Sequence, residues 1–265
     1  MESIDNLGWY RSFLDIRKET LQYVPTGFPS IDKLIDGWYH GTLNIIAARP
    51  GKGKTTSCIN FLSKLIDKEV CVWFGTETRK ERLIDKLISI REGLPDRRIR
   101  AGEDIDKVRR FSERLEGSKL FIEDKSAPSF EDVQRAVDIY EPKIVCIDYF
   151  QNMNHGLSKY RAAQSAYADT VKQLGNLSKD RKIIIIMASQ LRRPPEERRS
   201  QRPLMSDLKE TGEQEQVADT VMLLWGNEPR DEYLNIDITK ARDRSIGDVQ
   251  LRGMWDCGVL IDTVS

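Results

Sequence analysis

The sequence predicts one α/β domain with a mainly parallel central sheet, helices on both faces and an antiparallel extension at its C-terminal end. Short apolar runs alternate with longer amphipathic segments, a pattern typical of buried parallel strands and the helices that cover them. A glycine-rich loop directly follows the first of these runs, and a polar-apolar alternation begins near residue 234. We expect residues 23–265 to form this domain, preceded by an N-terminal helical extension over residues 1–22.

The individual elements follow from these patterns. Apolar runs predict strands at residues 43–47, 70–74, 120–122, 144–147, 183–188 and 221–225. Helical periodicity predicts helices at residues 54–65, 79–91, 104–115, 130–140 and 162–179. Shorter runs broken by polar turns predict antiparallel strands from residue 234 onward, including 249–251 and 259–261.

Apolar residues also recur at helical spacing before the core, at Ile4, Leu7, Tyr10 and Leu14. This amphipathic helix either packs on its own domain or docks on another copy of the chain, and the sequence leaves both readings open.

Composition narrows the class of protein. The 265 residues carry 42 Lys and Arg against 42 Asp and Glu, so a balanced charge argues against wholesale coating of nucleic acid. The longest apolar run, residues 183–188, falls far short of the ~20 residues of a membrane span, and the acidic N-terminus does not resemble a signal peptide. We therefore expect a cytoplasmic protein with no membrane partner. Its four widely spaced cysteines predict buried thiols and not a metal or disulfide framework.

The sharpest motif is a phosphate-binding loop between the first core strand and a helix. Its residues are Ala48, Arg49, Pro50, Gly51, Lys52, Gly53, Lys54, Thr55 and Thr56. Small residues let backbone N–H groups converge on phosphate, Lys54 meets the phosphate charge, and the Thr55 hydroxyl suits a magnesium ion. Ala48 replaces the usual first glycine, but alanine is also small. The loop predicts binding of ATP with Mg²⁺.

Three further strand ends supply groups that nucleotide hydrolysis needs. Asp148 ends the strand at 144–147, where its carboxylate can support the metal. Glu77 follows the strand at 70–74 and can activate the attacking water. Gln190 follows the strand at 183–188, and its amide can bond the terminal phosphate and report its loss to the next loop.

That next loop is rich in arginine. Paired prolines keep residues 191–203 from forming a helix or strand, so the side chains of Arg192, Arg193, Arg198, Arg199 and Arg202 are expected to project from a loop. They predict contacts with a phosphate backbone, with a solvated run of charges as the alternative. Lys159 and Arg161 form a second, weaker basic segment.

Together these motifs resemble the ATPase core of DnaB-type replicative helicases. The resemblance runs from residue 24 to the C-terminus and includes 74–77, 147–151 and 189–191. It also includes 202–212 and 215–219, and the stretch 205–219 is more diagnostic than the phosphate loop, which many families share.

The resemblance implies a RecA-like P-loop NTPase that assembles into a ring, usually a hexamer, and moves along single-stranded DNA. On this template Lys54 and Thr55 contact phosphate and metal, Glu77 is the catalytic base, Asp148 supports the metal, and Gln190 couples phosphate to DNA. Other replication proteins are further expected partners.

The family also supplies cations from a neighbouring subunit through a Lys-x-Arg sequence. Here that sequence is Lys240, Ala241 and Arg242, followed by Arg244 where the family commonly differs. We predict that Arg242 is the trans-acting residue, with Lys240 beside it and Arg244 as a competitor.

Two other classes remain open. A recombination-type or clock-type ATPase would remodel proteins or DNA without unwinding, and a loader or adaptor would use ATP as a switch.

Overall fold

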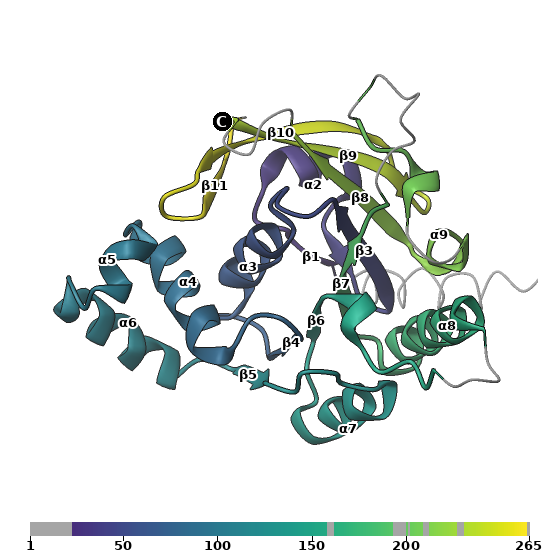
Figure 1. Ribbon diagram of the computed structural model, residues 1–265, viewed down its shortest axis with the longest axis horizontal. Coiled ribbons are helices and arrows are strands. Elements are labelled where there is room, and N and C mark those ends of the chain that lie inside the picture. Colours follow the sequence, from purple (N-terminus) through teal and green to yellow (C-terminus); the bar gives the residue numbers. More distant parts are fainter. Residues whose placement is uncertain are drawn as a thin grey trace, which may run out of the picture.

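The computed structural model describes residues 23–157, 162–192, 200, 202–208, 212–226 and 231–263. A large central sheet runs through this part of the chain (Figure 1). Its strands are β3 (Thr42–Ala48), β4 (Cys71–Gly75), β5 (Leu120–Glu123), β6 (Ile144–Asp148), β7 (Ile184–Gln190), β8 (Thr220–Trp225), β9 (Tyr233–Ala241), β10 (Gly247–Met254) and β11 (Val259–Asp262). A small separate ribbon pairs β1 (Tyr23–Val24) with β2 (Trp38–Tyr39).

The spatial order of the large sheet is β11-β10-β9-β8-β3-β7-β6-β4-β5. The strands from β8 to β5 run parallel to one another, and β9, β10 and β11 are antiparallel additions. This confirms the predicted parallel core with an antiparallel extension. It places β3 in the interior of the sheet, so the loop after β3 emerges between the carboxyl ends of β7 and β8.

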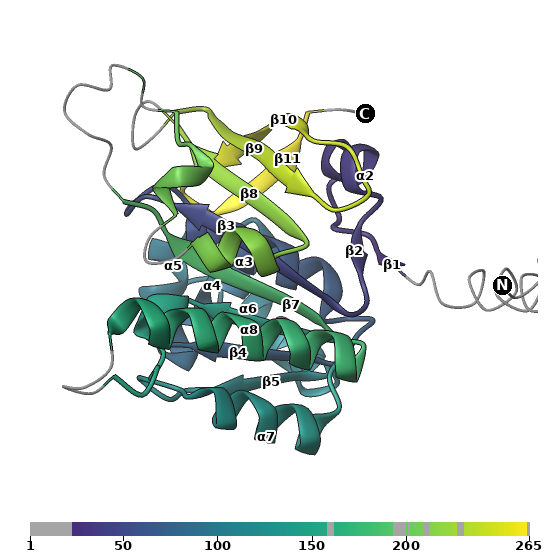
Figure 2. The same ribbon diagram turned by 90° about the vertical axis from the view of Figure 1, so that its right-hand side faces the viewer.

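Helices cover both faces of the sheet (Figure 2). They are α2 (Pro29–Ile35), α3 (Lys54–Leu65), α4 (Lys80–Glu92), α5 (Asp96–Arg100), α6 (Ile105–Glu116), α7 (Phe130–Tyr140), α8 (Ala163–Arg181) and α9 (Gly212–Val217), with short turns η1 (Phe150–Asn152) and η2 (Met205–Asp207). Successive side chains of each strand point to opposite faces of the sheet, so alternate residues pack into two separate hydrophobic cores, one on each face. Ile46 packs with α2 to α6, whereas Ile45 packs with α7 and α8.

Local signals explain where the helices begin and end. Ser129 caps α7 through a capping box with Asp132, whose carboxylate accepts the Ser129 N–H at 2.8 Å. Helix α8 continues past the predicted end at residue 179 because the chain leaves the helical conformation only at Lys182, where φ is 52°. The predicted bounds of α3 and α7 are confirmed, and α2, α5 and α9 are additional short helices.

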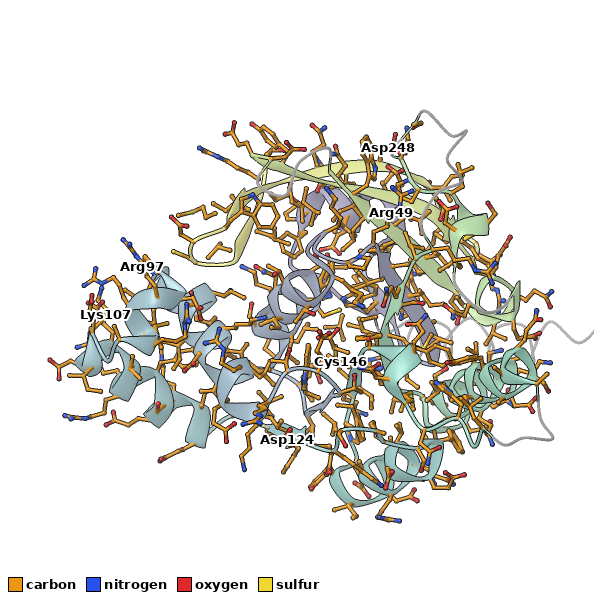
Figure 3. All side chains as sticks on the ribbon, in the orientation of Figure 1. Arg49, Arg97, Lys107, Asp124, Cys146 and Asp248 are labelled. Carbon is orange, nitrogen blue, oxygen red and sulfur yellow. The ribbon has the colours of Figure 1, made fainter. Side chains whose placement is uncertain are left out.

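The structure tests only some of the remaining expectations. The N-terminal helix predicted from Ile4 to Leu14 lies outside the described residues. All four cysteines are buried and free, as predicted. Across the described ranges, no helix combines the length and apolar character needed to cross a bilayer. On the outer helices, Arg97 and Lys107 point away from the sheet (Figure 3).

Candidate nucleotide site

The phosphate loop is held open by two glycines and ends in a helix. Gly51 and Gly53 have φ of 75° and 80°, a left-handed conformation that side chains with a Cβ rarely adopt. Gly53 is the N-cap of α3, so the first N–H groups of the helix point into the loop. Free N–H groups and the positive end of the helix dipole make this a binding place for an anion.

Side chains from the loop anchor it to its surroundings. Arg49 forms an ion pair with Asp207 at 3.6 Å. Lys52 donates to the carbonyl oxygen of Gly226 at 2.8 Å. The loop is therefore fastened both to η2 and to the end of β8. Ala48, at its start, is buried and completes β3.

Lys54 lies inside the loop, above an aromatic ring. Its Nζ is 3.7 Å from the ring centroid of Tyr149, a cation–π contact. Burial lowers the pKa of Lys54, while the charges of Asp148, Cys58 and Glu77 oppose that shift. A phosphate would supply the compensating negative charge that this half-buried ammonium lacks.

Asp148 and Thr55 form the candidate metal site. Asp148 is 1% exposed, and neither of its carboxylate oxygens has a well-formed hydrogen bond to a described residue. Burial raises the pKa of Asp148, and Lys54 and the Thr55 hydroxyl lower it. One carboxylate, one hydroxyl and incoming phosphate oxygens suit Mg²⁺, which is commonly held by one or two carboxylates together with substrate phosphates. The residues present thus fit the ion.

A pocket of about 470 Å³ is lined by Lys54 and Thr55, whereas the buried Asp148 is not among its lining residues. From the predicted nucleotide residues, it is lined by Arg49, Pro50, Gly51, Lys52, Gly53, Lys54, Thr55, Thr56, Glu77 and Gln190. Glu77 comes from the turn after β4 and Gln190 from the end of β7. Because parallel strands bring their carboxyl ends to one edge, residues far apart in sequence meet here, as the strand-end pattern predicted.

Sequence reasoning missed several residues of this pocket. Tyr149 and Lys86 line it, as do Tyr233 and Trp255 from the antiparallel extension. Lys86 also lowers the pKa of Asp148 by its charge. Tyr149 follows Asp148 directly, so its position gave a signal. The other three lie in segments without a motif, and only the fold brings them to the pocket.

The predicted trans-acting cations lie elsewhere. Arg242 forms an ion pair with Asp219 at 3.1 Å, and Asp219 in turn accepts the Leu43 N–H at 3.0 Å. Leu43 is at the amino end of β3, five residues before Ala48, which is about 16 Å at 3.3 Å per residue. Arg242 therefore lies at the sheet edge opposite the phosphate loop.

Lys240 and Arg244, on either side of Arg242 in the sequence, lie at the same sheet edge but make different contacts. Lys240 donates to the carbonyl oxygens of Glu215 and Gln216 at 2.5 and 3.2 Å, at the end of α9. Arg244 is more enclosed: it donates to the Ile35 and Gly37 carbonyls at 3.2 and 3.3 Å. Its guanidinium also lies 4.5 Å from the Tyr39 ring centroid. These contacts give Arg244 a role in joining the β9–β10 turn to α2.

The arginine-rich loop is described only at its two ends. Arg192 is exposed, and its N–H donates to the Asp207 carbonyl at 2.8 Å. Arg202 forms ion pairs with Asp237 at 2.7 Å and Asp248 at 2.6 Å. The remaining predicted DNA contacts, Lys159, Arg161, Arg193, Arg198 and Arg199, lie outside the described residues.

Comparison with known proteins agrees with this geometry. Residues 23–256 match the family described as DnaB-like helicase C terminal domain. A probable replicative DNA helicase of Trieres chinensis is 31% identical over 255 residues, which are 89% of this chain and 56% of that protein. The replicative DNA helicase DnaB of Geobacillus stearothermophilus is 27% identical over 95% of this chain and 58% of its own length. The chain thus spans about half the length of these curated relatives.

Among solved structures, one described as a DnaB-like replicative helicase and its interactions with primase superposes with a TM-score of 0.86. It is 25% identical to this chain, and the match covers 98% of this chain and 68% of the other.

Proposed function

Because this chain belongs to the family of DnaB-like helicase C-terminal domains, we propose that it is the motor of a replicative DNA helicase. It hydrolyses ATP with Mg²⁺ at the interface between neighbouring copies and uses the energy to move along single-stranded DNA. It assembles as a ring, usually of six subunits, and acts in the cytoplasm of a bacterium or of a phage host.

The observation that carries this proposal is the division of the catalytic groups between two edges. Lys54, Glu77 and Gln190 line one pocket, whereas Arg242 lies beside Asp219 at the opposite edge. A cation that far from the phosphates of its own chain can act only on the nucleotide of a neighbour. Hydrolysis that depends on a neighbour's arginine is coupled to assembly.

The roles at the pocket follow from the groups that meet there. Backbone N–H groups and Lys54 would hold the phosphates, and Asp148 and Thr55 would hold Mg²⁺, which would supply positive charge to the phosphate oxygens when bound. Glu77 lines the same pocket, and its exposed carboxylate can accept a proton from the attacking water. Gln190, whose main chain is fixed by the sheet, contacts the terminal phosphate. Tyr233 and Trp255 line the same pocket, and their flat aromatic surfaces suit a nucleotide base.

The test is ATP turnover by the purified chain with and without single-stranded DNA, together with its mass in solution. Lys54→Ala should abolish turnover, and Glu77→Gln should keep nucleotide binding while stopping hydrolysis. Arg242→Ala should be slow alone and partly recover when mixed with Lys54→Ala, because each variant supplies what the other lacks.

The controls separate this proposal from its alternatives. Arg244→Ala should lose stability through its contacts to α2 but show no such rescue. Failure of rescue in confirmed mixed assemblies would contradict a trans role for Arg242. An ATP turnover rate that single-stranded DNA does not change would favour a remodelling ATPase instead of a DNA motor.

A further inference from the structure

Strand β7 is longer than its neighbour β6. The two strands pair only as far as Ile147 and Met187, whereas on its other side β7 pairs with β3 through Gln190. The last backbone groups of β7 thus lack a strand on the β6 side, and such groups need other hydrogen-bond partners when they are buried.

The side chain of Gln151 takes the place of the missing strand. Its Oε1 accepts the N–H of Gln190 at 3.0 Å, and its Nε2 donates to the Ser189 Oγ at 3.0 Å. The Gln190 N–H can only donate, so this contact fixes which way the Gln151 amide points. A residue of η1, just after the metal-side Asp148, thereby holds the main chain of Gln190.

Ser189 extends the connection to a third element. Its hydroxyl donates to the Oε1 of Gln214 at 2.8 Å, and both side chains are fully buried, each 0% exposed. A hydroxyl has one proton, so Ser189 accepts from Gln151 while it donates to Gln214. Gln214 belongs to α9, which contacts α8 through an ion pair between Glu213 and Lys172 at 3.2 Å.

We propose that Gln151 and Gln214 are positioning residues for Gln190, joined through Ser189. These three residues, Gln151, Ser189 and Gln214, form a glutamine bridge that carries a displacement of Gln190 to η1 and to α9. The inference rests on the proposed function, in which Gln190 contacts the terminal phosphate. Buried hydrogen bonds are costly to leave unmade, so η1 and α9 must follow when the end of β7 moves.

The bridge reaches the segments that the motor would use. Segment 158–161, with its basic residues, follows η1 by a few positions, and α9 is the helix whose last carbonyls accept from Lys240. A change at the nucleotide therefore has a physical route to one predicted DNA-contacting loop and to the edge that carries Arg242.

Hydrogen exchange tests the route without requiring DNA. In the wild-type chain, a non-hydrolysable ATP analogue with Mg²⁺ should slow exchange at 49–56 and also at 149–157 and 212–217. Ser189→Ala removes both hydrogen bonds with little change of volume. It should keep the protection at 49–56 and reduce that at 212–217 by about 3-fold or more, as expected for a lost hydrogen bond. Protection at 149–157 should fall in Gln151→Ala, which also removes the direct bond to the Gln190 N–H.

Two outcomes of that experiment are distinct. Unchanged protection at 212–217 in Ser189→Ala, or at 149–157 in Gln151→Ala, would overturn the bridge and leave the proposed function intact. No protection at 49–56 in the wild-type chain would overturn nucleotide binding, and the bridge with it.

Kinetics supply a second readout with a variant that leaves the buried Ser189 in place. Gln151→Ala, Ser189→Ala and the double variant should each reduce DNA-stimulated kcat by about 5-fold while KM for ATP stays within about 2-fold. The double variant should match the singles, because they break one connected unit. Gln173→Ala, the same change on the exposed face of α8, should behave like wild type. Additive losses, or a loss in KM alone, would show separate structural roles and refute the bridge.

Discussion

Replacing Arg202 with alanine removes the guanidinium that faces a buried carboxylate. The Asp237 side chain is 4% exposed and accepts from Arg202 Nε at 2.7 Å, whereas Arg202 is 46% exposed. Breaking a fully buried ion pair costs about 3–5 kcal/mol, but solvent around the guanidinium screens this one, so about 1–3 kcal/mol is expected. The pair with the 62% exposed Asp248 adds less than about 1 kcal/mol.

The expected total is about 1–4 kcal/mol in the free energy of unfolding, measured by urea denaturation. At about 2–4 °C per kcal/mol for a domain of this size, the midpoint of thermal unfolding should fall by about 2–16 °C. The matched control is Arg252→Ala, because Arg252 pairs with Glu232 at 3.0 Å with both side chains more than half exposed. That variant should lose less than about 1 kcal/mol.

A second variant isolates the cause. Asp237→Asn placed in the Arg202→Ala chain removes the stranded charge and should recover more than half of the loss. If Arg202→Ala unfolds within about 0.5 kcal/mol of wild type while binding of single-stranded DNA weakens, the ion pair with Asp237 contributes little. Arg202 would then belong with the predicted DNA contacts.

The remaining predictions concern His155 and Gly175. Burial lowers the pKa of His155 to about 4 from 6.5, so the unfolded chain takes up its proton first. Stability should fall by up to about 3 kcal/mol as pH drops from 6.5 to 4, and in pH-dependent urea denaturation His155→Gln should flatten that part of the profile. A Cβ on Gly175 would lie 2.4 Å from Val217 Cγ1, so Gly175→Ala should lose about 1 kcal/mol despite better helix propensity. In a Val217→Ala background the same change should stabilise, and destabilisation there would show that the contact is not the cause.

The sequence was most informative where local patterns act over a few residues. Long apolar runs identified the parallel strands because burial on both faces demands them, and the spacing of Gly51, Gly53 and Lys54 identified the phosphate loop. Strand-end positions were enough to bring Glu77 and Gln190 to one pocket, since parallel strands share an edge. Short helices such as α2 were not recognised, because two turns carry too little periodicity.

Pairings between distant residues were beyond such patterns. Nothing near Arg202 in the sequence indicates Asp237, 35 residues away. Its five-arginine neighbourhood predicted DNA contact, with a solvated run of charges as the alternative. Likewise, the link from Gln151 to Ser189 spans 38 residues and depends on β7 being longer than β6. The hydrogen-bond and ion-pair partners of polar side chains are determined by the tertiary fold, and they cannot be read from one sequence.

The separation of Arg242 from the phosphate loop has a consequence for reaction kinetics. Suppose that each complete catalytic site needs the phosphate-loop pocket of one chain and Arg242 of the next. A monomer then has no complete site, and an open row of chains has one fewer complete site than it has chains. Only closure gives every chain a complete site, and contacts made head to tail allow such closure. Turnover per chain should therefore rise with protein concentration and level off once assembly is complete. A small excess of Arg242→Ala chains would depress it by occupying places in the assembly.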